Sequence, residues 1–173
     1  MPENKSSQAD SDADSVLVIT TGGTIDKVYF DSQSDYEVGE SVVGELLVQA
    51  RVEYPFSVLP LMRKDSLEMD DDDRRKIFDK VSNARQKKIV ITHGTDTMTE
   101  TARVLATIAD KTIVLTGSLA PARFAQTDAT FNIGMAFAAV QSLAPGTYIV
   151  MNGQVFSALS VEKDRKINQF VAR

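Results

Sequence analysis

The feature that most constrains the fold of this 173-residue sequence is a set of short, continuously apolar runs, each separated from the next by a stretch with helical spacing. Such runs are typical of strands buried on both faces, because a half-exposed strand alternates apolar and polar residues. Strands that alternate with helices predict an α/β fold, with a mostly parallel sheet between two helical layers, of Rossmann-like or flavodoxin-like type. The strands are expected near residues 16–20, 56–60, 88–92, 112–116 and 147–151.

Four helices are expected, over residues 40–50, from 70 onward, over 97–109 and over 131–140. The last is apolar nearly all round, so we expect it to be buried. The second begins at Asp70–Asp73, and we interpret these carboxylates as a solvated helix start, favoured by the helix dipole, rather than as a divalent cation site. Residues 26–38 show no periodicity and are expected to form a loop.

Composition divides the chain into a tail and one domain. Residues 1–15 are nearly devoid of apolar side chains, so we expect a disordered acidic tail before a domain over 16–173. No apolar run is long enough to cross a bilayer, and the polar start lacks the core of a signal peptide. Cysteine is absent, which excludes disulfides. The net charge of −5 disfavours nucleic acid as a partner. We therefore expect a cytoplasmic protein that binds neither nucleic acid nor membrane.

Three of the expected strands end in small polar residues, at Thr20–Thr24, Thr92–Thr97 and Thr116–Ser118. Ligands of open α/β sheets bind beyond the carboxyl ends of the strands, so these hydroxyls and one acid are expected to meet at one edge. Taken alone, the Thr-Gly-Gly-Thr after the first strand fits either a tight turn or a phosphate cradle. It is neither a dinucleotide fingerprint nor a Walker loop, since the required further residues are absent.

Two motifs together resemble the bacterial-type L-asparaginase/glutaminase family. They are Thr21-Gly22-Gly23-Thr24-Ile25 and Thr92-His93-Gly94-Thr95-Asp96-Thr97-Met98, each directly after an apolar run. Further segments are similar to the family pattern: Asp35–Gly39, Asp65–Met69, Thr116–Pro121, Asp128–Asn132 and Asn152–Phe156, with Lys163 beyond the last. The resemblance covers the amino-terminal part of the family's enzymes, which also carry a smaller carboxy-terminal domain.

The resemblance implies an amidohydrolase that converts a small side-chain amide, asparagine or a related one, to acid and ammonia with no cofactor and no metal. Thr24 is the expected nucleophile, and it needs a base or a polarising partner because a hydroxyl is a poor nucleophile at neutral pH. Tyr36 is expected to assist it. Thr95, Asp96 and Lys163 are expected to form a second hydroxyl triad, with the lysine as base and Asp96 orienting it.

The same resemblance assigns the binding groups. Ser66 is expected to receive the substrate carboxylate, Asp96 to hold its ammonium, and Gly94 to line the site. The oxyanion needs two fixed donors, for which the backbone N–H groups near Gly23–Thr24 and Gly94–Thr95 are candidates.

Several of these residues also have a purely structural interpretation. Thr24 fits a turn, Asp96 fits the N-cap of the helix that follows it, and Ser66 fits a cap of the helix that starts at residue 70. Lys163 lies in a charged run that would ordinarily be solvated. We interpret His93 as a packed, backbone-bonded residue at a strand end rather than as a catalyst.

Three functions stay open from the sequence: the amidohydrolase, a non-catalytic ligand-binding domain that keeps the pocket, and a subunit whose site a separately encoded partner completes. Leu67 and Ala120 depart from the family pattern, since both replace residues that are commonly polar. Because the family is oligomeric, a homodimer or homotetramer is expected.

Overall fold

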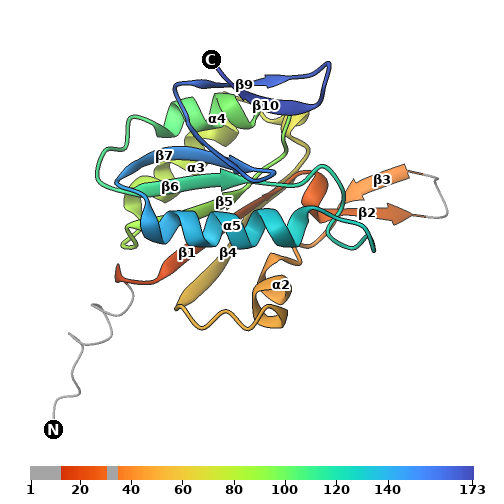
Figure 1. Ribbon diagram of the computed structural model, residues 1–173, viewed down its shortest axis with the longest axis horizontal. Coiled ribbons are helices and arrows are strands. Elements are labelled where there is room, and N and C mark those ends of the chain that lie inside the picture. The colour runs from red at the N-terminus through yellow and green to blue at the C-terminus, as the bar shows by residue number, and fades with distance from the viewer. Residues whose placement is uncertain (1–12, 31–34) are drawn as a thin grey trace, which may run out of the picture.

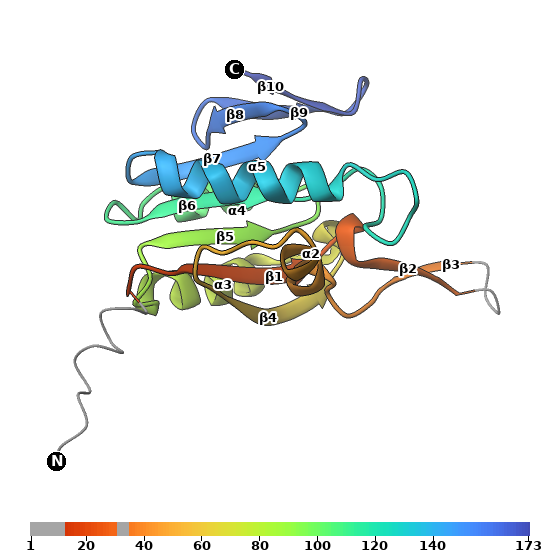
Figure 2. The ribbon, with the colours of Figure 1, turned by 60° about the horizontal axis from the view of Figure 1, so that its bottom comes forward.

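A six-stranded sheet in the order β4-β1-β5-β6-β7-β8 forms the centre of the computed structural model, which describes residues 13–30 and 35–173 (Figures 1 and 2). The parallel strands are β1 (Val16–Gly22), β4 (Phe56–Lys64), β5 (Lys88–Thr92), β6 (Thr112–Thr116) and β7 (Gly146–Met151), and β8 (Gln154–Ser157) runs antiparallel to β7. Taken in chain order, the five parallel strands have the flavodoxin-like arrangement 2-1-3-4-5. The predicted α/β fold with a mostly parallel sheet is confirmed.

Helices cover both faces of the sheet (Figure 1). α3 (Asp71–Asn83) and α4 (Met98–Leu105) pack on one face, and α2 (Val43–Gln49) and α5 (Ala129–Ser142) on the other. Leu17 and Ile19 of β1 belong to the first core, whereas Val16 and Val18 belong to the second. Because successive strand residues point to opposite faces, burial on both sides requires the continuous apolar runs of the sequence.

The strand register aligns the polar strand ends. Thr20 of β1 pairs with Thr92 of β5, and Thr92 pairs with Thr116 of β6. The carboxyl ends of the three strands therefore share one edge, as the sequence predicts. The strand order reverses between β1 and β5, which is where open α/β sheets form their ligand crevice.

The expectation of a loop over residues 26–38 is wrong. β2 (Lys27–Phe30) and β3 (Asp35–Val38) form an antiparallel hairpin in which Tyr29 pairs with Tyr36. The hairpin projects from the body of the molecule beside the carboxyl end of β1 (Figure 2). Aromatic and β-branched residues on both sides of a polar stretch favour such a hairpin, but the two runs are too short to show a period.

A second hairpin, β9 (Val161–Asp164) and β10 (Gln169–Ala172), follows β8, where the sequence predicts no strand. Val161 and Phe170 are buried in the core that contains α3 and α4. These two buried side chains anchor the hairpin on the domain. Because most residues around them are charged, the sequence shows no apolar alternation that would predict the two strands.

The helices differ from the predicted ones mainly at their ends. α4 ends at Leu105 rather than near residue 109. α5 is longer than predicted and not buried all round, since Phe131 is 62% exposed. α3 begins as predicted within the aspartate run: Asp70 caps the helix, and its carboxylate accepts a hydrogen bond from the Asp73 N–H at 2.9 Å.

The expected tail, residues 1–15, lies mostly outside the described residues. At its end, the Asp14 carbonyl accepts a hydrogen bond from the Tyr54 hydroxyl at 2.7 Å, and the Asp14 carboxylate pairs with Lys88 Nζ at 2.9 Å. The packed domain therefore begins slightly before residue 16.

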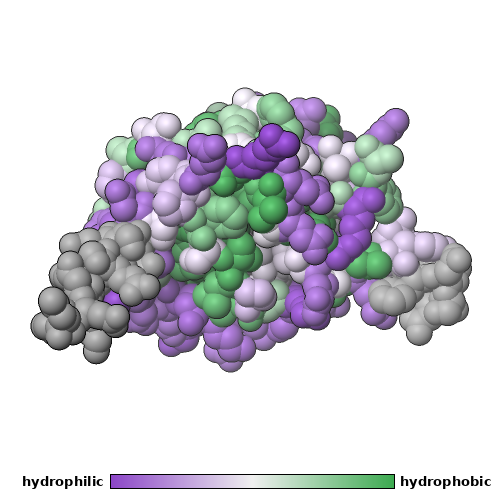
Figure 3. All heavy atoms as spheres, turned by 90° about the horizontal axis from the view of Figure 1, so that it is seen from below, coloured by the Kyte–Doolittle hydropathy of each residue, from purple (hydrophilic) through white to green (hydrophobic). Residues whose placement is uncertain are grey.

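β4 forms one edge of the sheet, and its Val58, Leu59, Leu61 and Met62 are partly buried. Seen from below, where α2, α5 and β4 lie, the molecule shows apolar side chains gathered in its middle (Figure 3). None of the helices over the described residues is long and apolar enough to span a membrane.

Candidate active site

Two glycines at the end of β1 bring the Thr24 turn against the loop after β5. Gly22 and Gly23 have φ angles of 99° and 87°, and Thr24 opens a short 3-10 turn, Thr24–Asp26. A Cβ atom on Gly23 would lie 2.5 Å from both Cα and N of Gly94. Only glycine permits this approach, which places Thr24 and Thr95 on adjoining loops.

Ser66 lies at the point where these loops meet. A Cβ atom on Gly94 would lie 2.5 Å from Ser66 Oγ, and Ser66 itself is 1% exposed. Its carbonyl accepts a hydrogen bond from Thr97 Oγ1 at 2.7 Å, but within the described part of the chain its hydroxyl has no partner. Because Asp70 is the cap of α3, the interpretation of Ser66 as a cap is wrong. Buried hydroxyls without a partner are rare in folded proteins, so this one is a candidate contact for a bound ligand or water.

Lys163 joins two of the predicted catalytic residues. Its Nζ donates to Thr95 Oγ1 at 2.7 Å and to Asp96 Oδ1 at 2.8 Å. Only 7% of the Lys163 side chain is exposed, so the interpretation of a solvated charge run is wrong. The Asp96 carboxylate does not cap α4 either: Thr97 occupies the N-cap position, without a side-chain bond. β9 thus places Lys163 directly against the β5 loop.

Tyr36 lies on the projecting hairpin, where its ring contacts two other aromatic rings. The ring centroid lies 5.3 Å from that of Tyr29 and 6.2 Å from that of Phe124 in the loop after β6. About half of the Tyr36 side chain is exposed. The hairpin therefore carries Tyr36 on its surface, outside the buried cluster of Thr95 and Ser66.

One candidate oxyanion donor is already occupied. The Gly23 N–H donates to the Lys64 carbonyl at 2.9 Å, so it cannot also serve a reacting oxygen. Of the candidates that the sequence suggests, the N–H groups of Thr24, Gly94 and Thr95 remain.

His93 is a packed residue, as predicted. Nδ1 lies 2.7 Å from the Gly94 carbonyl oxygen and Nε2 lies 2.8 Å from Thr101 Oγ1. Because a carbonyl can only accept, Nδ1 carries the proton and Nε2 accepts from the threonine hydroxyl. Burial lowers the pKa of the imidazole to about 4, so it is neutral at physiological pH.

Asp26 is a buried acid that the sequence did not single out. It is 1% exposed, and burial raises its pKa to about 6 against the opposing effect of hydrogen bonds from Ser41 and the Val42 N–H. Among the described residues, its Oδ1 has no partner. The Asp26 carbonyl also accepts from the Gly39 N–H at 2.9 Å, which closes the base of the hairpin.

Asp128 fixes the loop after β6. Its carboxylate accepts from the Leu119 N–H at 3.0 Å and the Ala120 N–H at 3.1 Å, and from the Asn152 side chain at 3.0 Å. Burial opposes ionisation, but these donors together hold the pKa of Asp128 below its ordinary value. The sequence indicates this residue only through its place in the family pattern.

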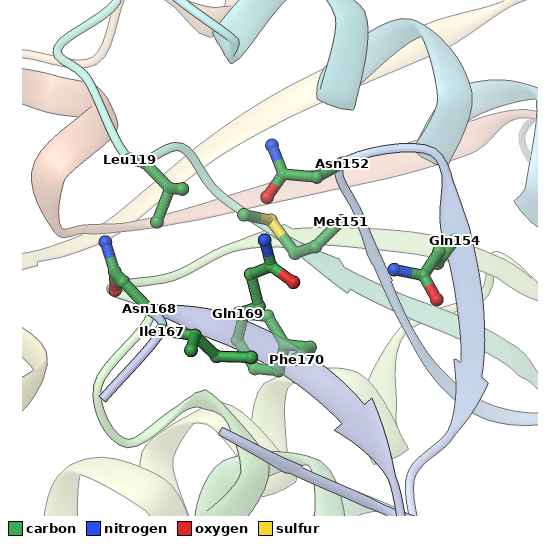
Figure 4. Close-up of a pocket in the computed structure, with 8 residues that line it drawn as sticks. All are labelled: Leu119, Met151, Asn152, Gln154, Ile167, Asn168, Gln169 and Phe170. Atoms are coloured by element: carbon green, nitrogen blue, oxygen red, sulfur yellow. The ribbon is translucent and has the colours of Figure 1, made fainter. Parts of the chain in front are cut away.

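A pocket of about 390 Å³ opens between the loop after β6, the β7–β8 turn and the β9–β10 hairpin (Figure 4). None of the site residues predicted from the sequence lines it; its walls include Leu119, Asn152 and Phe170. In the part of the chain that the structure describes, no group of three or more His, Cys, Asp or Glu residues is placed to hold a metal ion.

The fold defines a flavodoxin-like α/β domain, in which Thr95, Asp96, Lys163 and Ser66 lie beyond the carboxyl ends of the strands. The chain belongs to the asparaginase family: residues 15–169 match the family described as "Asparaginase, N-terminal".

Proteins with similar sequences and structures are asparaginases. The chain is 30% identical to L-asparaginase 2 of Bacillus subtilis (strain 168), over 88% of this chain and 44% of that protein. It is 31% identical to the probable periplasmic L-asparaginase of Haemophilus influenzae, over 88% and 47%. The crystal structure of a probable cytoplasmic L-asparaginase from Campylobacter jejuni superposes with a TM-score of 0.77 at 28% identity, over 91% of this chain and 51% of that one. The chain thus spans about half the length of the relatives it matches.

Proposed function

We propose that this domain hydrolyses the side-chain amide of asparagine or of a related small amide. The observation that carries the proposal is the hydrogen-bonded group of Thr95, Asp96 and Lys163 beside the Thr24 turn. A structural role alone would not require a lysine to lie almost fully buried between a hydroxyl and a carboxylate. Membership of the asparaginase family supports this chemistry.

The reaction begins when the Thr24 hydroxyl attacks the amide carbon. The new carbon–oxygen bond gives a tetrahedral oxyanion, which the N–H groups of Thr24 and Thr95 stabilise. Collapse breaks the carbon–nitrogen bond, and the proton from the Thr24 hydroxyl leaves with the nitrogen as ammonia. Water then attacks the acyl-enzyme, gives its proton back to Thr24 and releases the acid. Tyr36 assists Thr24 from the hairpin.

The Thr95 hydroxyl takes part in the proton transfers. Lys163 Nζ lies within hydrogen-bond distance of Thr95 Oγ1, so it is placed to exchange a proton with this hydroxyl, while Asp96 orients the amine. Thr95 in turn activates the water that cleaves the acyl-enzyme. No metal or cofactor enters this scheme.

Substrate binding uses Ser66 and Asp96. The Ser66 hydroxyl, which has no partner among the described residues, receives the substrate carboxylate, and the Asp96 carboxylate, which also binds Lys163, holds the ammonium. Leu67 supplies no polar partner next to Ser66, and its side chain is 65% exposed. An incompletely paired charged substrate binds weakly, so we expect slow hydrolysis with a high KM and little discrimination among small amides.

Ammonia release from a panel of small amides tests the proposal, with asparagine, glutamine and a neutral amide at millimolar concentrations. Thr24→Ala is expected to abolish the release of ammonia. Thr107→Ala, which changes an exposed threonine just after α4 that belongs to none of the predicted site residues, should leave it intact. Equal release by the wild type and Thr24→Ala would show that the activity is a contaminant. A wild type that binds aspartate in calorimetry but releases no ammonia would favour a ligand-binding domain.

We also propose that the chain forms a homodimer or homotetramer in the cytoplasm. The partly buried apolar residues along the open edge of β4 support an assembly, and the match to a protein titled a cytoplasmic asparaginase supports the compartment. Sedimentation of a species heavier than the 18.9 kDa chain is the expected result. A monomer at high concentration would contradict the assembly.

A further inference from the structure

The loop between β6 and α5, residues 117–128, contacts the catalytic turn and the β2–β3 hairpin at three points. The Ala122 N–H donates to the Ile25 carbonyl at 3.0 Å, directly after Thr24. Arg123 Nη2 donates to the Glu40 carbonyl at 3.1 Å, just beyond the end of the hairpin. The Phe124 ring packs against the Tyr36 ring, with centroids 6.2 Å apart and an interplanar angle of 54°.

The loop that carries Phe124 is itself well fixed. The Phe124 N–H donates to the Pro121 carbonyl at 3.0 Å, and Thr127 Oγ1 donates to the Ala120 carbonyl at 3.2 Å. The Asp128 carboxylate binds the beginning of the loop through the Leu119 and Ala120 N–H groups. The backbone that carries Phe124 is therefore fixed by bonds within the loop as well as by those to Ile25 and Glu40, which places the ring where the Tyr36 ring can pack on it.

Neither ring is fixed by burial in the core. Phe124 is 42% exposed and Tyr36 is 45% exposed. A tilted aromatic pair favours one relative orientation, because the positive edge of one ring meets the negative face of the other. The pair thus adds a directional contact at the point where the projecting hairpin meets the body.

We infer that Phe124 is a positioning residue, which holds Tyr36 and the hairpin in one orientation relative to the Thr24 turn, and that loss of this contact impairs the assistance that Tyr36 gives to Thr24. The inference rests on the proposed amidohydrolase function. Phe124 takes no part in the chemistry. Its contribution passes through Tyr36, and this makes the two residues energetically coupled.

A double-mutant cycle tests the coupling. Ammonia release is measured for the wild type, Phe124→Ala, Tyr36→Ala and the double variant, with Phe131→Ala as a matched control at a more exposed phenylalanine. Phe124→Ala should lower kcat/KM by about two- to tenfold in the wild type and by nothing further when Tyr36 is already alanine. Phe124→Tyr should retain the wild-type value, and Phe131→Ala should not change it. Equal losses in both backgrounds, or no loss at all, would overturn the inference.

Hydrogen exchange of the hairpin amides gives a readout that needs no activity. Phe124→Ala should speed exchange over residues 27–30 and 35–38 by about two- to tenfold, and Phe131→Ala should leave it unchanged. If the wild type releases no ammonia, the proposed function fails, and faster exchange would still show that Phe124 holds the hairpin. Unchanged exchange in Phe124→Ala would overturn the inference whether or not the protein is active.

Discussion

The buried acid Asp26 makes a sharp prediction about how stability depends on pH. Asp26→Asn preserves the shape of the side chain and removes its charge. In the folded protein, the carboxylate is shielded from water, one oxygen has no partner in the described part of the chain, and burial raises the pKa from 3.8 to about 6. Ionisation of this group therefore opposes folding.

The size of the effect follows from proton linkage. Between pH 4 and pH 6 the folded state holds the Asp26 proton while the unfolded state has lost it, so the free energy of unfolding falls as pH rises through this range. A difference of about two pKa units corresponds to about 3 kcal/mol, all of it lost above pH 6. Asparagine does not titrate. Asp26→Asn should therefore be more stable than the wild type by up to about 3 kcal/mol at pH 8, and the difference should disappear toward pH 4.

Urea denaturation followed by circular dichroism, at pH values from 4 to 8, measures this difference directly. Titration of every other group cancels when the variant is compared with the wild type at each pH. The control is Asp79→Asn, since Asp79 lies on the exposed side of α3. A difference that is constant with pH, or a variant less stable than the wild type at pH 8, would refute the reasoning about Asp26.

Three further predictions concern the stability effects of His93, Gly23 and Gly134. Burial lowers the pKa of His93 to about 4, so the unfolded state binds its proton between pH 6.5 and 4 while the folded state does not, and the free energy of unfolding falls as pH falls through this range. His93→Gln should therefore lose about 3 kcal/mol less of its free energy of unfolding than the wild type between pH 6.5 and 4. The same denaturation series measures this difference. Gly23→Ala should lower stability by about 2 kcal/mol or more, because its Cβ would strain the backbone and clash with Gly94, and thermal unfolding should show a clearly lower Tm. Gly134→Ala is its matched control, because a Cβ there meets nothing within 4 Å inside α5; it should raise stability by about 0.5–1 kcal/mol, and a loss would contradict the open space beside Gly134.

The sequence predicted the sheet because its strands leave a strong signal. Strands buried on both faces must be continuously apolar, and the apolar runs beginning at Val16 and Ile89 admit few other interpretations. The meeting of Thr20, Thr92 and Thr116 at one edge then follows from parallel alignment alone. The fold class and the alignment of these polar strand ends are therefore both predictable from the order of residues along the chain.

The remaining features depend on tertiary contacts that leave no local pattern. Lys163 lies among charged neighbours, and only the pairing of β9 with β10 and the burial of Phe170 place it against Thr95. Resemblance to a family singled it out, whereas composition would have assigned it to solvent. The Tyr36–Phe124 contact joins two segments far apart in sequence, so no spacing predicts it.

The most direct test of the central claim compares two lysines in the same hairpin. Lys163→Met removes the amine that contacts Thr95 and Asp96, whereas Lys166→Met removes an exposed amine only three residues away. Ammonia release from asparagine is measured for both variants and for the wild type, and circular dichroism checks that all three are folded. We expect Lys166→Met to retain wild-type release and Lys163→Met to lose about a hundredfold or more, as for the loss of a general base. Equal release by folded Lys163→Met and Lys166→Met would contradict it.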